Sequence, residues 1–104
     1  MTKVRVDARA AEEVTESAIW YEGESPGLGG ALIDAFEHAV ELLGDKLPPL
    51  SKMPGKAGIV GAKRLILHRF PFSVVVLERA DETVVIALAH HSRRPGYWND
   101  RIDT

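Results

Sequence analysis

The sequence predicts one α+β domain, covering residues 1–104, in which a β-sheet packs on a helical hairpin. Two observations carry this prediction. Apolar residues recur at three- and four-residue steps through the first half, whereas valine-rich runs of strand length fill the second half. A length of 104 residues suits a single domain with one hydrophobic core. The expected order is β-α-α-β-β-β: an N-terminal strand plus an antiparallel C-terminal meander, packed on two antiparallel helices.

The chain opens with KVRVD, in which Val4 and Val6 alternate with polar residues as in a short, half-buried strand. Asp7 can cap the following helix, because its carboxylate can accept the free amide hydrogens of a first turn. Glycine favours a helix end near Gly23. The apolar residues of this first helix follow helical spacing: Ala11, Val14, Ala18 and Tyr21. Of the Trp20–Tyr21 pair, we expect one ring in the core and the other against the Pro26 loop.

A second helix is predicted to stop around Gly44. Its apolar positions again recur at helical steps: Leu32, Phe36, Ala39, Val40 and Leu43. The short Pro- and Gly-containing link before it favours an antiparallel hairpin with the first helix. After it, DKLPPLSKMPGKAG at 45–58 cannot continue a helix, because its prolines remove amide donors. We interpret this stretch as a surface loop.

Three strands are predicted in the second half, at 62–70, 72–79 and 83–90. Pro71 marks the first junction between them and Asp81–Glu82 the second, so tight connections should give an antiparallel meander. The valine runs of the middle strands indicate that both faces of the sheet are largely covered.

Composition excludes several classes of site. The chain has no cysteine, so it can hold neither a disulfide nor a thiolate metal site. The opening residues lack the apolar stretch of a signal peptide, and no apolar run approaches about 18 residues. We therefore expect a cytoplasmic protein without membrane contact, metal or cofactor. The net charge is −2, but residues 1–51 carry a balance of −6 and residues 52–104 one of +4, which allows one positive face.

The chain ends with HHSRRPGYWNDR at 90–101, where cations and large rings follow a buried strand. His90 and His91 are adjacent on a strand, so their side chains should diverge and cannot chelate one metal. Tyr97 and Trp98 can stack on a base or fold over the core, and we favour the core for Trp98. The tail arginines suit surface ion pairs, phosphate or carboxylate equally: Arg93, Arg94 and Arg101.

Four features resemble the RelE/ParE superfamily of type II toxin–antitoxin modules, whose members include plasmid stabilisation proteins. They are AIWYEGESPGLGGAL at 18–32, HRFPFSVVV at 68–76, VVIALAHHSRRPGYW at 84–98, and a Pro-rich loop where the family varies in length. The resemblance spans roughly residues 3 to 101. It implies a growth-inhibiting toxin that is neutralised by a cognate antitoxin, and it leaves a monomer, a homodimer and a toxin–antitoxin hetero-oligomer open.

The family divides by target, and the resemblance leaves three functions open. One branch poisons DNA gyrase without known nuclease chemistry, another cleaves mRNA on the ribosome without metal, and a non-toxic binding domain would retain the fold alone. For a nuclease, the candidate catalytic residues are Arg64, His91, Arg93 and Tyr97. Candidate contacts to the target or the antitoxin are Lys63, Arg64, Arg93, Arg94, Tyr97 and Arg101.

Ser73 is a departure from the ribosome-dependent relatives, which commonly carry an arginine right after the hairpin aromatic. A serine cannot hold the negative charge of a phosphorane as a guanidinium does, since it brings neither charge nor a bidentate fork. Ile66, the next position on the same side as Arg64, is not basic either. Because Ser73 and Ile66 bring no positive charge beside Arg64, the sequence favours the gyrase branch.

Overall fold

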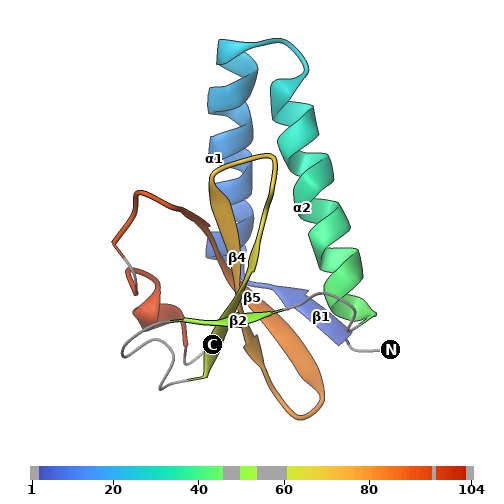
Figure 1. Cartoon of the computed structure of the whole chain (residues 1–104), viewed down its shortest axis with the longest axis vertical. Coiled ribbons are helices and arrows are strands. Elements are labelled where there is room, and N and C mark those ends of the chain that lie inside the picture. Colours follow the sequence, from blue (N-terminus) through green and yellow to red (C-terminus); the bar gives the residue numbers. More distant parts are fainter. Residues whose placement is uncertain (1–2, 46–49, 54–60, 95, 103–104) are drawn as a thin grey trace.

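The computed structural model describes residues 3–45, 50–53, 61–94 and 96–102 (Figure 1). The elements follow the order β1 (Lys3–Val6), α1 (Ala8–Glu24), α2 (Leu28–Gly44), β2 (Ser51–Lys52), β3 (Ala62–Ile66), β4 (Phe72–Glu78), β5 (Glu82–His90) and a short 3-10 helix, η1 (Asn99–Arg101). Figure 1 shows α1 and α2 side by side, with the turn that joins them extending beyond the sheet. The predicted α+β arrangement of strands and helical hairpin is confirmed.

The five strands form one sheet in the order β1-β5-β4-β3-β2. Strands β3, β4 and β5 pair antiparallel, as the predicted meander requires, and β1 pairs in parallel with β5. The sheet differs from the prediction at Ser51–Lys52, which we assigned to a loop. These two residues pair with Arg64 and Lys63 of β3 as a short polar edge strand. Their lack of apolar alternation is why the pattern gave no strand signal. Residues 46–49 and 54–58 of the predicted loop lie outside the described residues.

Both helices begin at polar caps. Asp7 accepts the amide hydrogen of Arg9 at 2.9 Å, which confirms the predicted N-cap of α1. The carboxylate of Glu22, near the end of α1, accepts the amides of Gly27 and Gly29 at 2.9 and 3.0 Å. These hydrogen bonds hold the pKa of Glu22 below its usual value. One side chain of α1 thus supplies the N-terminal cap of α2 and fixes the turn between the helices.

Apolar side chains cover both faces of the sheet, as the valine runs predicted. On the helix side, the core includes Leu32, Phe36, Val74, Val76 and Val85. On the opposite face, the C-terminal tail covers a second cluster that includes Met53, Val75, Leu77, Ile86 and Trp98. Trp98 is only 1% exposed, so the predicted fold-back of this ring over the core is confirmed.

The Trp20–Tyr21 pair differs in part from the expectation. Tyr21 packs on the core, with its ring edge-on to Phe70 and Phe72 at centroid distances of 5.2 and 6.2 Å. Trp20 is 60% exposed instead of being covered by the Pro26 loop. The reason is rotation around α1: the buried side is formed by Ala10, Val14 and Ala18, and position 20 lies away from it.

The two helices approach each other closely at Gly29, where a Cβ atom would lie 2.3 Å from the carbonyl oxygen of Ala18. We therefore expect Gly29→Ala to lower the free energy of unfolding by about 1–3 kcal/mol, since one helix must move to admit a methyl group. Urea denaturation followed by circular dichroism measures this loss. Gly30→Ala is the matched control, because its Cβ would meet nothing within 4 Å. Equal stability of the two variants would contradict the close approach.

Glu22 gives the hairpin turn a pH dependence. Because folding lowers the pKa of this carboxyl, its contribution is present above its ordinary value of 4.5 and is lost as the pH falls through the lower folded value. The stability difference between wild type and Glu22→Gln should therefore shrink on acidification below about pH 4.5. Thermal melts of both proteins across pH 3–7 test this. A constant gap would show that the charge of Glu22 does not matter.

Candidate functional site

A small cavity of about 110 Å³ opens on the sheet face that carries the C-terminal tail. Five of its lining residues are candidate catalytic or contact residues of the sequence analysis: Arg64, His91, Arg93, Arg94 and Tyr97. None of the described lining residues is acidic, so the cavity wall is cationic. Cavities that bind whole small molecules span about 300–1,000 Å³. This smaller cationic cavity suits a single anionic group, such as one phosphate or one carboxylate.

Arg64 and Ser73 reach the cavity from neighbouring strands. Arg64 lies opposite Val75 in the β3–β4 register, and Ser73 is two residues before Val75, so both side chains lie on the same face. The Nε atom of Arg64 is buried and has no hydrogen-bond partner among the described residues. Ser73 is 3% exposed, and its Oγ atom lies 3.0 Å from Nε2 of His91. The cavity wall thus includes the hydroxyl of Ser73, the imidazole of His91 and, from strand β3, the guanidinium of Arg64.

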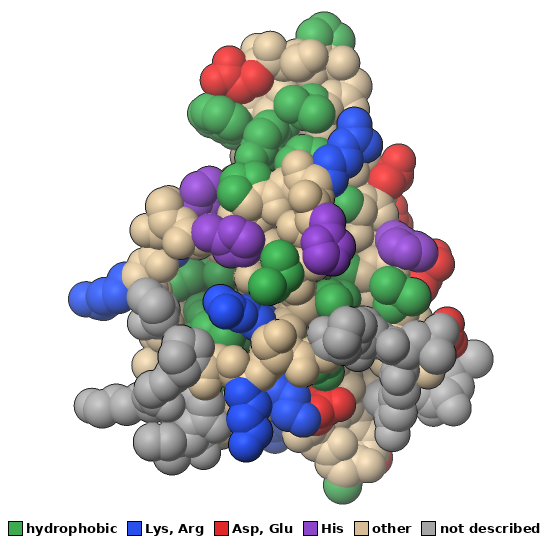
Figure 2. Space-filling view, viewed as in Figure 1, with side chains coloured by type: hydrophobic (Ala, Val, Ile, Leu, Met, Phe, Trp, Pro, Cys, Tyr) green, Lys and Arg blue, Asp and Glu red, His purple; other side chains and the backbone are tan. Residues whose placement is uncertain are grey.

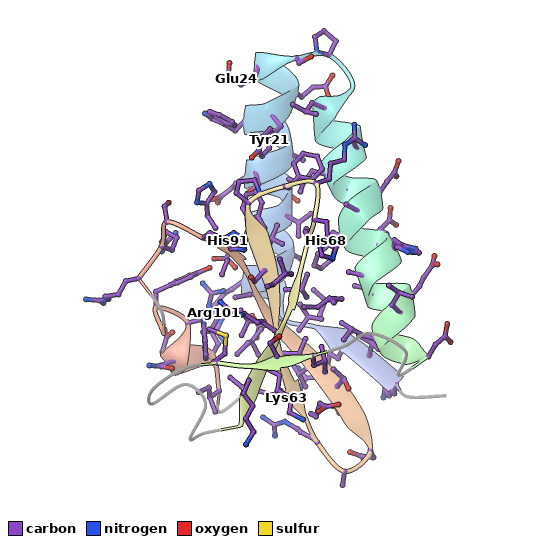
Figure 3. The ribbon with its side chains drawn as sticks, viewed as in Figure 1. Tyr21, Glu24, Lys63, His68, His91 and Arg101 are labelled. Atoms are coloured by element: carbon purple, nitrogen blue, oxygen red, sulfur yellow. The ribbon has the colours of Figure 1, made fainter. Side chains whose placement is uncertain are left out.

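The adjacent histidines diverge, as expected at a strand end. His90 meets the ring of Phe72 edge-on at 5.1 Å, and its Nδ1 accepts the backbone amide of Ser92 at 3.0 Å. His91 instead reaches Ser73 on the other face, while its own amide donates to the carbonyl of Pro71 at 2.9 Å. Figure 3 shows His91 on the tail side of the sheet, away from His68. Of the two, His91 is the ring with a polar partner inside the cavity.

The carboxylate of Glu13, on α1, holds both the C-terminal tail and strand β5 through hydrogen bonds. It accepts from the hydroxyl of Tyr97 at 2.6 Å and from Nη1 of Arg101 at 2.8 Å. It also accepts the backbone amide of Leu88 at 3.1 Å. Burial and the hydrogen bond to Glu13 raise the pKa of the Tyr97 hydroxyl well above its usual value. Tyr97 is therefore a poor source of a tyrosinate base at neutral pH.

The ion pair between Glu13 and Arg101 also binds backbone groups at the edge of β5. β1 ends at Val6, which lies opposite Val85, while β5 continues to His90. Beyond that point Arg101 donates to the carbonyl of Ile86 at 2.9 Å, and Glu13 accepts the amide of Leu88. The Glu13–Arg101 pair thus serves backbone groups that a longer β1 would otherwise pair. Both side chains are largely buried, at 17% and 13% exposed.

The ring of Tyr97 also contacts the side chain of Arg93. The guanidinium carbon of Arg93 lies 4.0 Å from the centroid of the Tyr97 ring, a cation–π distance. Arg93 and Arg94 are otherwise exposed at the cavity mouth. The ring of Tyr97 therefore supports a cation at the mouth rather than presenting a free face to a base.

Two of the predicted contact residues lie outside the cavity. Lys63 is on the other face of β3 from Arg64 and pairs with Glu78 at 2.6 Å. Arg101 binds Glu13 and the sheet edge, as described above. The four candidate catalytic residues do line one cavity, whereas Lys63 and Arg101 do not. Glu13 was missed from the sequence, because a glutamate on the polar side of a helix gives no sign of a partner 88 residues away.

A second, larger groove of about 610 Å³ runs between α2 and β3. Its walls are mainly apolar and include Ala39, Leu42, Leu65 and Leu67, and basic side chains stand along it: His38, His68 and Arg69. His90 and His91 line the first cavity, so all four histidines of the chain lie at one cavity or the other. Figure 2 shows the histidines in a band across the visible face.

A five-stranded sheet packed on a helical hairpin is the ParE-like toxin fold that the sequence motifs predict. A solved chain described as "Chromosomal ParDE TA system from P. aeruginosa" is similar to it, with a TM-score of 0.70 and 17% sequence identity. The match covers 86% of this chain and 96% of that chain. Neither the scan of protein-family models nor the search of curated proteins finds a match to the sequence. No helix among the described residues is long and apolar enough to cross a membrane.

We expect Glu13→Ala to be among the most destabilising single substitutions in this chain. It leaves Arg101 and the hydroxyl of Tyr97 without their shared acceptor, and removing one partner of a buried ion pair costs about 3–5 kcal/mol. Urea unfolding compared with Glu12→Ala, an exposed neighbour, measures the difference. Matching midpoints for the two variants would contradict the structural role of Glu13.

Proposed function

We propose that this protein is the toxin of a type II toxin–antitoxin module, acting in the cytoplasm under control of a cognate antitoxin. The observation that carries the proposal is the fold, which aligns over most of both chains with one from a ParDE system. The sequence motifs at the hairpin turn, the β3–β4 connection and the tail support it independently. Fold alone does not define function, so the proposal also rests on the two cavities.

The apolar groove beside α2 is the seat that we propose for the antitoxin. An amphipathic segment can lay an apolar side along Leu42, Leu65 and Leu67. Carboxylates on its flank can then meet His68 and Arg69 at the rim. A segment that is disordered when free suits such a long groove, because it can wrap a surface and be exchanged readily.

DNA gyrase is the target that we propose first. Cleavage of RNA without metal needs groups that move protons and a cluster of cations for the phosphorane. Here the neutral Ser73 lines the cavity, and the hydroxyl of Tyr97 is held by Glu13 with a raised pKa. Both features weaken the chemistry of a nuclease and leave a surface suited to binding.

A ribosome-dependent endoribonuclease is the second candidate, because one observation favours it. Arg64, His91 and Arg93 line the same cavity, and the size of that cavity suits one phosphate. In that case His91 would be the group that moves the proton, and the two arginines would hold the charge.

Expression of the chain in bacteria, with and without Arg93→Ala and His91→Ala, tests the function and separates the targets. A gyrase toxin arrests growth, inhibits supercoiling by purified gyrase and leaves mRNA intact. A nuclease gives mRNA cuts in primer extension that disappear in His91→Ala. Lys63→Ala is the control, because this cation lies outside the cavity and should leave either activity unchanged. Wild-type expression without growth arrest would refute the toxin proposal and favour a non-toxic binding domain.

A substitution in the groove should separate toxicity from neutralisation. We expect Leu42→Glu to keep the growth arrest but to escape rescue by the protein encoded beside this gene, because a buried carboxylate would face the apolar side of the antitoxin. Arg69→Glu, at the exposed rim, should weaken the rescue without risk to the core. Ile33→Glu, also on α2 but outside the groove lining, is the control. Full rescue of both groove variants would place the antitoxin elsewhere.

A further inference from the structure

The outer face of α1 carries large apolar side chains that the fold does not use. Positions 12, 16, 19, 20 and 23 recur at three- and four-residue steps, so they lie on one side of the helix. All five are exposed: Glu12, Glu16, Ile19, Trp20 and Gly23, which we call the α1 stripe. Ile19 is 68% exposed and Trp20 is 60% exposed, the two highest values among the exposed large hydrophobic residues.

Trp20 is placed as an anchor for a partner rather than as a core residue. Its ring packs against the Tyr21 ring in a T-shaped arrangement, with centroids 5.0 Å apart and planes at 88°, while 60% of the Trp20 surface stays exposed. Tyr21 in turn packs on Phe70. A tryptophan on a rigid support loses little conformational freedom on binding, which is why such residues often dominate interfaces.

The charge around Trp20 limits what can bind there. Residues 8–44, which hold both helices, contain eight acidic side chains and one basic side chain, Arg9. Glu13 and Glu22 are engaged in hydrogen bonds within the chain, whereas Glu12 and Glu16 are exposed on the stripe itself. A nucleic acid would be repelled from this face. A second copy of the chain, packed α1 against α1, would bring the glutamates of the two copies close together, and their negative charges would repel.

We propose that the α1 stripe docks a Lys- or Arg-bearing segment of the toxin's protein target, with Trp20 as the anchor. A cationic side chain over the Trp20 ring gains a cation–π contact, and Glu12 and Glu16 supply the complementary charge. This inference rests on the proposed function, because it assigns the surface to the target of the toxin. The stripe belongs to α1, whereas the groove proposed for the antitoxin is lined from α2 and β3.

The test uses the full chain with purified DNA gyrase, in a supercoiling assay and in a growth assay. Trp20→Ala should raise the toxin concentration needed for half inhibition by about 30-fold, as expected for a dominant interface residue. Glu16→Lys should weaken inhibition most at low salt, because charge attraction is screened as the salt rises. Ile33→Ala and Glu37→Lys, exposed positions on α2, are the matched controls and should inhibit as wild type does.

The outcomes separate this inference from the proposed function. If wild type and Trp20→Ala inhibit gyrase equally, the stripe is not the target surface, although the toxin proposal stands. If wild type arrests growth without inhibiting gyrase, the growth assay decides: loss of arrest in Trp20→Ala supports the stripe for another protein target, and retained arrest overturns it. If wild type does not arrest growth, both proposals fall. Circular dichroism melts confirm that each variant is folded.

Discussion

The position of the C-terminal tail depends on the hydrogen bonds that the carboxylate of Glu13 accepts from Tyr97 and Arg101. This carboxylate joins the first helix to the last turn of the chain, and it binds Tyr97, which lines the cationic cavity. Through Tyr97 it sets the position of Arg93, since that guanidinium rests on the ring that Glu13 holds. A charge in the acidic half of the sequence therefore holds two cations of the basic half, Arg101 directly and Arg93 through Tyr97.

The two cavities differ in the chemistry of the side chains that line them. The small one is cationic and lies between the tail and one face of the sheet, whereas the groove beside α2 is apolar with basic side chains along it. The α1 stripe is a third surface, which is acidic and carries an exposed tryptophan. Under the proposed function, this separation lets the target and the antitoxin each be selected by a different kind of contact.

Much of the fold follows from local patterns. The cap at Asp7, the helical spacing and the valine runs each act within a few residues, so the sequence alone reveals them. Lys63 is predicted from the sequence as a contact beside Arg64, whereas the register places only Arg64 on the same face as Ser73. What could not be predicted depends on distant pairing or on rotation: the bond from Tyr97 to Glu13, 84 residues away, the edge strand at Ser51–Lys52, and the outward side of Trp20.

The ion pair at the end of β5 has a consequence for how the chain behaves among its own copies. An uncovered strand edge offers free amides and carbonyls to any neighbouring chain, and proteins protect such edges to avoid aggregation. Here Arg101 donates to the carbonyl of Ile86, and Glu13 accepts the amide of Leu88. Proteolytic removal of the last few residues, Arg101 included, would thus leave backbone groups at the edge of β5 open to pairing with another copy of the chain.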